Sequence, residues 1–204
     1  MKRRQVLLAG IAALGLLAAG CDTSKPRFRN TDITGADYAK DFALTDHTGK
    51  PVTLASYQGR VVTVFFGFTH CPDVCPTALA EMRVVLEKLG PDAARVQVLF
   101  VTVDPERDTQ DLLSKYVPAF HPSFVGLTSD PATIARTAKS FKVYYQKVPG
   151  KTPGSYTVDH SSGTFVYDPQ GRLRLFVRPA GAAEEPSQAI ERVTADLRVL
   201  LAGG

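Results

Sequence analysis

The sequence lacks the charge pattern of a nucleic-acid-binding protein. It has 24 Lys and Arg residues against 20 Asp and Glu residues, a formal net charge of +4. Lys2, Arg3 and Arg4 supply three of the positive charges, and without them 21 basic residues stand against 20 acidic ones, a net charge of +1. No basic stripe interleaved with aromatic residues occurs, so we expect no nucleic-acid partner.

The sequence also lacks a convincing membrane-spanning run, which would take about 20 apolar residues. The apolar stretch 6–19 is shorter than this and follows the basic residues Lys2-Arg3-Arg4. A short apolar run behind a positive segment is typical of a secretory signal. We therefore predict a signal peptide over residues 1–20.

The predicted signal ends in small residues followed by Cys21. This pattern resembles the bacterial lipoprotein cleavage site, where the cysteine becomes the lipid-modified first residue of the mature protein. It departs from the usual pattern at Ala18, where leucine is common. We expect lipidation of Cys21 and a polar, lipid-anchored linker over residues 21–38. The alternative is an ordinary secretory signal that leaves Cys21 as a spare thiol.

Cysteine is scarce, with three residues in a chain of 204. If Cys21 carries a lipid, one pair remains, Cys71 and Cys75. In an exported protein such a close pair is compatible with a disulfide. A structural disulfide, a redox couple and a metal site all remain open at this point.

Residues 39–204 are expected to form one domain with a substantial core, because 44% of the chain is hydrophobic and 22% is charged. The order of elements is mixed α/β. The pattern predicts strands over 41–46, 52–54, 61–68, 95–103, 124–127, 164–167 and 173–177, and helices over 77–89, 109–117, 130–141 and from 186 onward. Residues 143–156 read as a long flexible loop or a ragged hairpin. Strands 41–46 and 52–54 form an N-terminal hairpin extension.

Cys71 and Cys75 fall between the buried strand 61–68 and the helix that follows it. Cysteines at the first strand–helix junction of such a unit favour a thioredoxin-like fold, with a central mixed sheet flanked by helices. Pro76 predicts that Cys75 is the helix N-cap. The positive end of a helix should lower a thiol pKa and stabilise the thiolate. Residues four apart on a helix have Cβ atoms roughly 5–6 Å apart, which leaves room for a disulfide after slight deformation or for a metal ion.

His160 is the expected third member of this group. In a thioredoxin-like fold the loop before the late hairpin faces the first strand–helix turn, and thioredoxins usually place a cis-proline there. This chain has Val158-Asp159-His160-Ser161 instead. Two thiolates and one imidazole suit Cu(I) and tolerate Cu(II), whereas a structural zinc site normally takes four protein ligands and would need His70 as well.

The acidic residues near these positions receive more modest assignments. Asp159 is a candidate outer-shell acceptor that orients His160, although a solvated carboxylate explains it equally well. Asp104, Glu106 and Asp108 precede the helix over 109–117. We interpret these three as helix-capping residues.

Three stretches together resemble one protein family. They are 66–77 (FGFTHCPDVCPT), 103–109 (VDPERDT) and 158–161 (VDHS). In these motifs the chain resembles the SCO/SenC family of copper-binding, thioredoxin-like proteins, over about residues 41–177. The resemblance implies copper ligands at Cys71, Cys75 and His160.

The same resemblance implies a role in assembling the dinuclear copper centre of cytochrome c oxidase. Its copper-accepting subunit would be the main partner, and other periplasmic copper chaperones or thiol reductants are further candidates. Family members are typically membrane-anchored and face the periplasm or the mitochondrial intermembrane space. Because a lipid on Cys21 replaces the transmembrane helix of many members, we expect a bacterial protein anchored at the periplasmic face of the cell envelope.

Three functions are compatible with these features. The first is a copper chaperone that passes one copper ion to an acceptor by ligand exchange. The second is a thiol–disulfide reductase in which Cys71 and Cys75 cycle as a redox pair and keep the cysteines of an envelope protein reduced. The third is a copper-responsive signalling or redox-sensing module.

Overall fold

The computed structural model of the chain describes residues 27–180 and 184–203. The predicted signal peptide over residues 1–20 and the candidate lipidation residue Cys21 lie outside the described residues. Within the described ranges, no helix has both the length and the apolar character needed to cross a membrane.

Two parallel strands, β4 (Val61–Gly67) and β5 (Val96–Thr102), form the centre of the structure. Every residue of both strands is buried, as expected for parallel strands whose two faces are covered by helices. β6 (Val125–Thr128) continues the sheet parallel to β5, and β9 (Thr164–Tyr167) pairs antiparallel to β4. The predicted central strands are therefore confirmed.

The complete sheet is mixed and has the strand order β1-β10-β9-β4-β5-β6-β2-β3. Its outer strands are β1 (Thr31–Asp32), β2 (Ala43–Asp46), β3 (Pro51–Thr53) and β10 (Leu173–Val177). β2 and β3 form the predicted N-terminal hairpin, and β2 joins the sheet by pairing with β6.

The N-terminal part of the described chain differs from the prediction. Residues 27–38 were expected to belong to a polar linker, but β1 pairs with β10. The backbone N–H groups of Arg29 and Asn30 both donate hydrogen bonds to the buried carboxylate of Asp196. A carboxylate buried in the last helix thus fixes this segment to the domain, a contact across 167 positions that the local sequence does not indicate.

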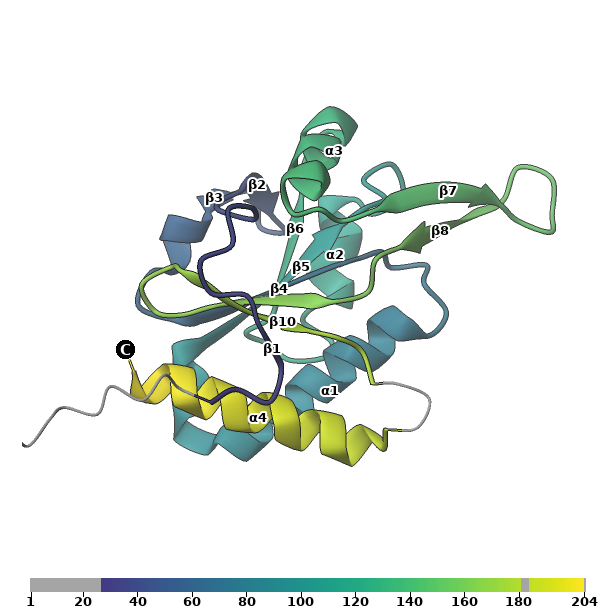
Figure 1. The fold of residues 1–204 in the computed structure, drawn as a ribbon. Helices are drawn as coiled ribbons and strands as arrows, with labels where there is room; N and C mark the ends of the chain where they lie inside the picture. The colour runs from purple at the N-terminus through teal and green to yellow at the C-terminus, as the bar shows by residue number, and fades with distance from the viewer. Residues whose placement is uncertain (1–26, 181–183, 204) are drawn as a thin grey trace, which may run out of the picture.

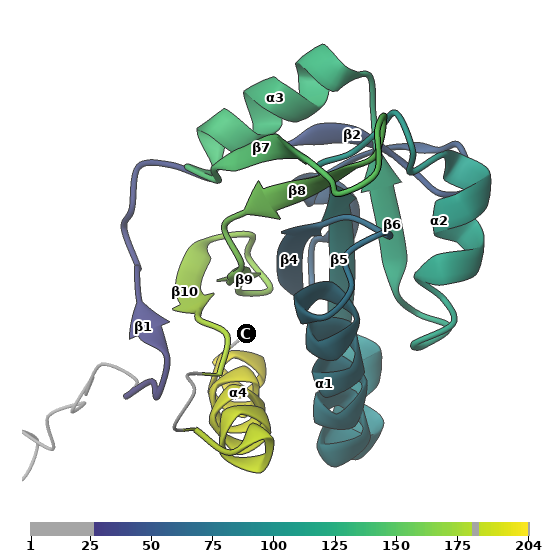
Figure 2. The ribbon, with the colours of Figure 1, turned by 90° about the vertical axis from the view of Figure 1, so that its right-hand side faces the viewer.

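Within residues 27–180 and 184–203, four α-helices flank the sheet. α1 and α4 pack side by side on one face, and α2 and α3 lie on the other (Figures 1 and 2). Their bounds are α1 (Val74–Leu89), α2 (Gln110–Tyr116), α3 (Pro131–Ser140) and α4 (Pro186–Ala202), with short 3₁₀ segments at Leu54–Tyr57 and Gly90–Arg95. The predicted mixed sheet with flanking helices is confirmed.

Helix α1 begins earlier than predicted. Asp73 is the N-cap, so Cys75 is the second helical residue rather than the cap, and Pro76 is the third rather than the first. Proline is tolerated there because the first four N–H groups of a helix have no intrahelical partner. Both thiols therefore sit at the first turn of α1.

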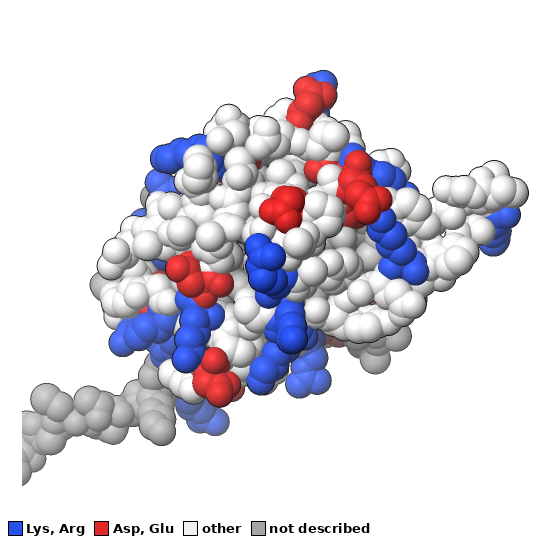
Figure 3. Space-filling view, turned by 90° about the horizontal axis from the view of Figure 1, so that it is seen from above, with Lys and Arg blue, Asp and Glu red and all other residues white. Residues whose placement is uncertain are grey.

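The segment 143–156 contributes to a hairpin that projects from the body of the domain. β7 (Tyr145–Pro149) and β8 (Tyr156–His160) pair antiparallel in a separate two-stranded sheet. The hairpin extends sideways in Figure 1 and again in the view from above, where acidic and basic side chains are interspersed over the visible face (Figure 3). Of the two predicted alternatives, the hairpin is the one observed, and it carries His160 at the end of its second strand.

Candidate metal centre

The loop between β4 and α1 places the two thiols. Cys71 N–H donates to the Phe68 carbonyl at 3.3 Å, which closes a turn at the end of the strand. Cys75 N–H then donates to Sγ of Cys71 at 3.4 Å. Cys71 is 7% exposed, Cys75 is fully buried, and no disulfide joins them. Cys71 is thus the more exposed thiol of the pair.

A buried carboxylate fixes the start of this loop. Asp108 accepts hydrogen bonds from the Thr69 N–H at 3.0 Å, from Thr69 Oγ1 at 2.6 Å and from Thr102 Oγ1 at 2.7 Å. Burial raises the pKa of Asp108, while these three hydrogen bonds oppose that shift because they favour the charged form. Thr69 lies two residues before Cys71, so Asp108 fixes the start of the loop that carries the thiols.

The capping role predicted for the acidic residues before α2 is wrong. The N-cap of α2 is Thr109, whose side chain accepts from the Leu112 N–H. Asp104 and Asp108 are fully buried, and Glu106 forms an ion pair with Lys147. The local pattern of acids before a helix is compatible with caps, but tertiary contacts decide their use.

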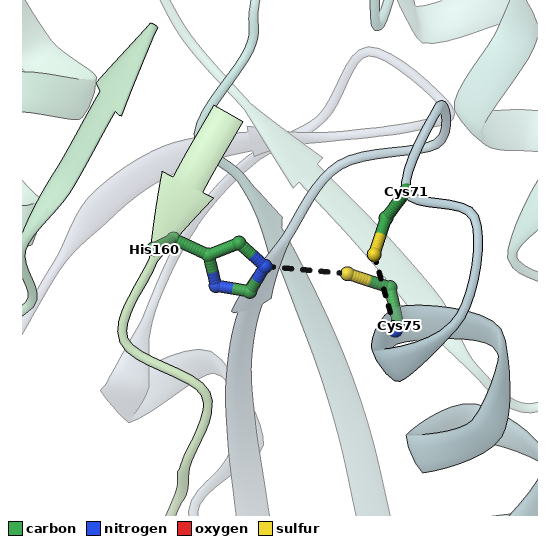
Figure 4. A group of neighbouring side chains, drawn as sticks. All are labelled: Cys71, Cys75 and His160. Carbon is green, nitrogen blue, oxygen red and sulfur yellow. Dashed lines mark hydrogen bonds between the residues drawn. The ribbon is translucent and has the colours of Figure 1, made fainter. Parts of the chain in front are cut away.

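His160 approaches the thiols from the end of β8. Its Nε2 lies 3.4 Å from Sγ of Cys75 (Figure 4). Its Nδ1 lies 3.0 Å from the Ser161 carbonyl oxygen. A carbonyl oxygen can only accept, so Nδ1 carries the proton and the lone pair of Nε2 faces the sulfur. The ring also packs edge-on against Phe65 and Phe68, with centroids 6.2 and 5.8 Å away. His160 is therefore held in the orientation and tautomer of a metal ligand.

The three predicted ligands come together. The donor atoms of Cys71, Cys75 and His160 all lie within 4.8 Å of one another. The geometry supplies two sulfurs and one nitrogen around a single point, as soft transition metals prefer.

The other candidates do not join the cluster. His70 is about half exposed, and its Nδ1 contacts the Thr69 hydroxyl. His47 and His121 are engaged with Gly126 and Ser123 at other loops. Asp159 is exposed, and the Ser161 carbonyl instead takes the outer-shell position considered for it, as the acceptor for Nδ1 of His160.

Burial controls the electrostatics of the cluster. It raises the pKa of the Cys75 thiol strongly, and nearby Cys71 and Asp108 add to this effect. The same desolvation lowers the pKa of His160 below its ordinary value of 6.5. The prediction that the helix N-terminus lowers the pKa of this thiol is therefore wrong for Cys75, because removal from water outweighs the helix dipole. Both groups are neutral at pH 7 in the metal-free protein.

The site opens to the surface through a shallow depression. Its wall includes Phe68, Pro72, Val74, Thr157 and Ser162 around Cys71 and His160. Val74 is 44% exposed, an unusual position for a large apolar side chain in the described chain. The candidate ligands thus lie just below an opening lined by both apolar and polar side chains.

Comparison with known proteins identifies the family. The model of the SCO1/SenC family matches residues 30–195. The chain belongs to the SCO1/SenC family. The bovine mitochondrial "Protein SCO2 homolog" is 39% identical over 163 residues, which cover 79% of this chain and 61% of the bovine protein. The chain therefore spans less than two thirds of the length of this relative.

Solved structures of the SCO1/SenC family agree with the fold. The structure of Bradyrhizobium japonicum ScoI with copper bound is 45% identical, with a TM-score of 0.67, and covers 79% of this chain and 98% of ScoI. The apo Sco1 protein from Thermus thermophilus is 44% identical, with a TM-score of 0.73, and covers 87% of this chain and 99% of that protein. The predicted thioredoxin-like fold is confirmed.

Sequence reasoning missed the contact between two residues near the site, Arg107 and Tyr156. Arg107 lies over the Tyr156 ring and donates to its backbone carbonyl. The signal that could have found Arg107 is its place in the stretch 103–109, which the resemblance already singled out. For Tyr156, no local pattern distinguishes it from the other loop tyrosines.

Proposed function

We propose that this protein is a copper chaperone that binds one copper ion through Cys71, Cys75 and His160. The convergence of these three donors within 4.8 Å carries the proposal. The unprotonated Nε2 facing Cys75 supports it further, because a metal ligand needs that lone pair. The copper-bound ScoI relative, at 45% identity, adds support from a known protein.

The donor set favours copper over zinc. Two thiolates with Cu(I) carry a net charge of −1, and with Cu(II) a net charge of zero. Neither oxidation state leaves a large uncompensated charge in a buried site, so copper can change oxidation state in place. A structural zinc site normally takes four protein ligands, whereas His70, the nearest further candidate in the sequence, is directed to Thr69.

Delivery to the dinuclear copper centre of cytochrome c oxidase is the function that family membership supports best. Transfer requires that an acceptor's ligands replace those of the chaperone one at a time. Cys71 is the more exposed of the two thiols, and the opening beside Pro72 and Val74 gives an acceptor access to it, which suits this exchange. The acceptor would be the copper-binding subunit of the oxidase, met at the periplasmic face of a bacterial envelope to which a lipid on Cys21 anchors the chain.

A thiol–disulfide reductase is the second candidate. The hydrogen bond from Cys75 N–H to the Cys71 sulfur favours it, because the same contact would assist attack by Cys71 on a disulfide. The raised pKa of Cys75 counts against it, since this thiol must ionise unaided to complete the exchange, whereas in copper binding the metal displaces the proton. Copper binding at the proposed site requires His160 as a ligand, whereas thiol–disulfide exchange does not.

Anaerobic copper titration of the reduced protein tests the proposal and separates it from the alternative. We expect one Cu(I) per chain, with affinity lost in Cys71→Ser and lowered in His160→Ala by more than the roughly 10–100-fold that loss of an outer-shell partner causes. His70→Ala is the matched control and should bind as wild type does. Substoichiometric copper in the wild type, or unchanged affinity in His160→Ala, would refute the chaperone function. Disulfide reductase turnover that survives His160→Ala would favour the alternative.

A further inference from the structure

One short segment contacts both halves of the candidate metal centre. Residues 104–108 follow β5, and at one end Asp108 holds Thr69 of the thiol loop. At the other end, Asp104 and Arg107 contact Tyr156, the first residue of β8. The thiols and the imidazole are therefore tied to the same five residues.

The contacts at Tyr156 are close and varied. Its hydroxyl donates to Oδ1 of Asp104 at 2.8 Å, and its backbone carbonyl accepts from Nη1 of Arg107 at 2.9 Å. The Arg107 guanidinium lies 3.7 Å from the centroid of the Tyr156 ring and pairs with the fully buried Asp104 carboxylate. A planar guanidinium can stack on a ring and donate in its own plane at once, which a lysine cannot do.

Strand geometry connects Tyr156 to His160. Side chains alternate along a strand, so Tyr156, Val158 and His160 share one face of β8. The burial pattern agrees, because Val158 is buried and Tyr156 and His160 are partly buried, while Thr157 and Asp159 are exposed. Fixing Tyr156 therefore fixes which face of β8, and which register, brings His160 to Cys75.

The hairpin needs such an anchor because it stands apart from the main sheet. β7 and β8 pair with each other in a sheet of their own. Two-stranded hairpins are marginally stable alone. The Glu106–Lys147 ion pair also joins the hairpin to this segment, but both of its side chains are about half exposed, so it should contribute little.

We propose that Arg107, together with Asp104, is a positioning residue that clamps Tyr156 and so sets the distance between His160 and the thiol pair. The inference rests on the proposed copper-binding function. Arg107 touches neither the thiols nor the imidazole; it acts through β8. The Nη2 atom of Arg107 is buried without a hydrogen-bond partner among the described residues. The hydrogen bonds that hold the guanidinium are therefore those to Asp104 and Tyr156.

The test compares two conservative variants with a control. Arg107→Lys keeps a positive charge beside Asp104 but loses the planar fork, and Tyr156→Phe keeps the ring but loses the hydroxyl. Glu106→Gln removes the exposed ion pair between the same two elements but leaves Lys147 over the Tyr156 ring. For each full-length reduced protein we would measure amide hydrogen exchange of β8 without metal and Cu(I) affinity by competition with a chelator.

We expect both clamp variants to exchange β8 amides at least about tenfold faster, with β4 and β5 unchanged, because a local opening becomes easier. Cu(I) affinity should fall about 10–100-fold, the range for loss of an outer-shell partner. Glu106→Gln should stay within about twofold of wild type in both measurements, as expected for an exposed ion pair.

Several outcomes would overturn the inference. Unchanged β8 exchange in both variants would mean that the clamp does not hold the hairpin, and wild-type affinity with faster exchange would mean that the hairpin's position does not set the site. If the amides of β4 and β5 also exchange faster in Arg107→Lys, that variant is destabilised as a whole. The result for Tyr156→Phe, which removes a single oxygen atom, then decides whether the clamp holds the hairpin. If the wild type binds no copper, the proposed function fails separately, and β8 exchange alone then supports or refutes the clamp.

Discussion

Sγ of Cys75 lies 3.4 Å from Nε2 of His160, a residue 85 positions further along the chain. Burial shifts the pKa values of the two groups in opposite directions, upward for the thiol and downward for the imidazole. Both are therefore uncharged at neutral pH, and they meet as a thiol facing an imidazole lone pair rather than as a thiolate–imidazolium pair. A cation that replaces the thiol proton would be held by both groups.

The first prediction concerns the pH dependence of copper binding. A cysteine must lose its proton to bind a metal, and the raised pKa of Cys75 means that this proton is present at pH 6–8. Apparent affinity for Cu(I) should therefore rise at least about tenfold per pH unit over this range, because the metal displaces one proton from that thiol. His160 should add no steeper region above pH 6.5, because its pKa is lowered and it is already neutral there.

Chelator competition at constant ionic strength measures this slope. His70→Ala should follow the wild-type curve, since His70 lies outside the ligand cluster. A flat affinity between pH 6 and 8 would show that Cys75 is already ionised and that the helix N-terminus controls it after all.

The sequence was sufficient to predict which three residues the structure brings together, but not their electrostatics. The expected thioredoxin-like fold predicts that Cys71 and Cys75 lie at a strand–helix junction. It also predicts that His160 faces them from the position where thioredoxins usually have a proline. The pKa of Cys75 does not follow from it, because the core that surrounds this thiol is assembled from distant strands. Local reasoning considered only the helix dipole and missed desolvation, which is the largest effect on the pKa of this thiol.

The misassigned segments fail for a related reason. Asp104 and Asp108 have the composition of helix caps, but their partners Tyr156 and Thr69 lie 52 and 39 positions away. Likewise, Arg29 and Asn30 look like part of a polar linker until Asp196 is brought beside them. Sequence patterns describe what each residue can do locally, and tertiary contacts between polar groups select among those roles.

The second prediction concerns Gly67, the last residue of β4. A Cβ at this position would lie 2.8 Å from ring carbons of Phe65 and Phe100 and 2.9 Å from Sγ of Cys75. Gly67→Ala should therefore destabilise the fold by about 1–3 kcal/mol, as overpacking does. It should also displace the Cys75 sulfur and lower Cu(I) affinity about tenfold or more, comparable to loss of an outer-shell partner.

Urea unfolding and copper titration of Gly67→Ala provide the two measurements. Gly203→Ala is the matched control, because its new Cβ would meet its nearest neighbour, the Val199 carbonyl oxygen, at an ordinary 3.6 Å. Wild-type affinity in a folded Gly67→Ala protein would mean that Cys75 can move aside without changing the site.

The third prediction concerns Asp168, in the turn between β9 and β10. Its side chain is 2% exposed and accepts hydrogen bonds from the guanidinium groups of Arg172 and Arg174 and from the backbone N–H groups of Gln170 and Arg172. Burial alone would raise the pKa of Asp168, but the Arg172 N–H and the two guanidinium groups outweigh it and lower the pKa below 3.8. The charged carboxylate is thus the form that stabilises the folded protein.

Asp168→Asn should lower the free energy of unfolding at pH 7 by about 2 kcal/mol, because an amide keeps the turn but loses charge-assisted hydrogen bonds. Most of this loss should come through Arg174, since Arg172 is 63% exposed and well screened. The control is Asp111→Asn, which removes an ion pair whose side chains are 71% and 76% exposed and should cost nothing measurable.

The pH dependence of this difference gives the sharper test. A carboxylate whose folded pKa is lowered contributes its full stability above the unfolded pKa, near 3.8, and loses it as the pH falls through the folded value. The gap between wild type and Asp168→Asn in urea unfolding should therefore be constant from pH 7 down to about pH 5 and shrink below about pH 4. A gap that persists unchanged at pH 3 would mean that Asp168 stabilises the turn through its shape and not through its charge.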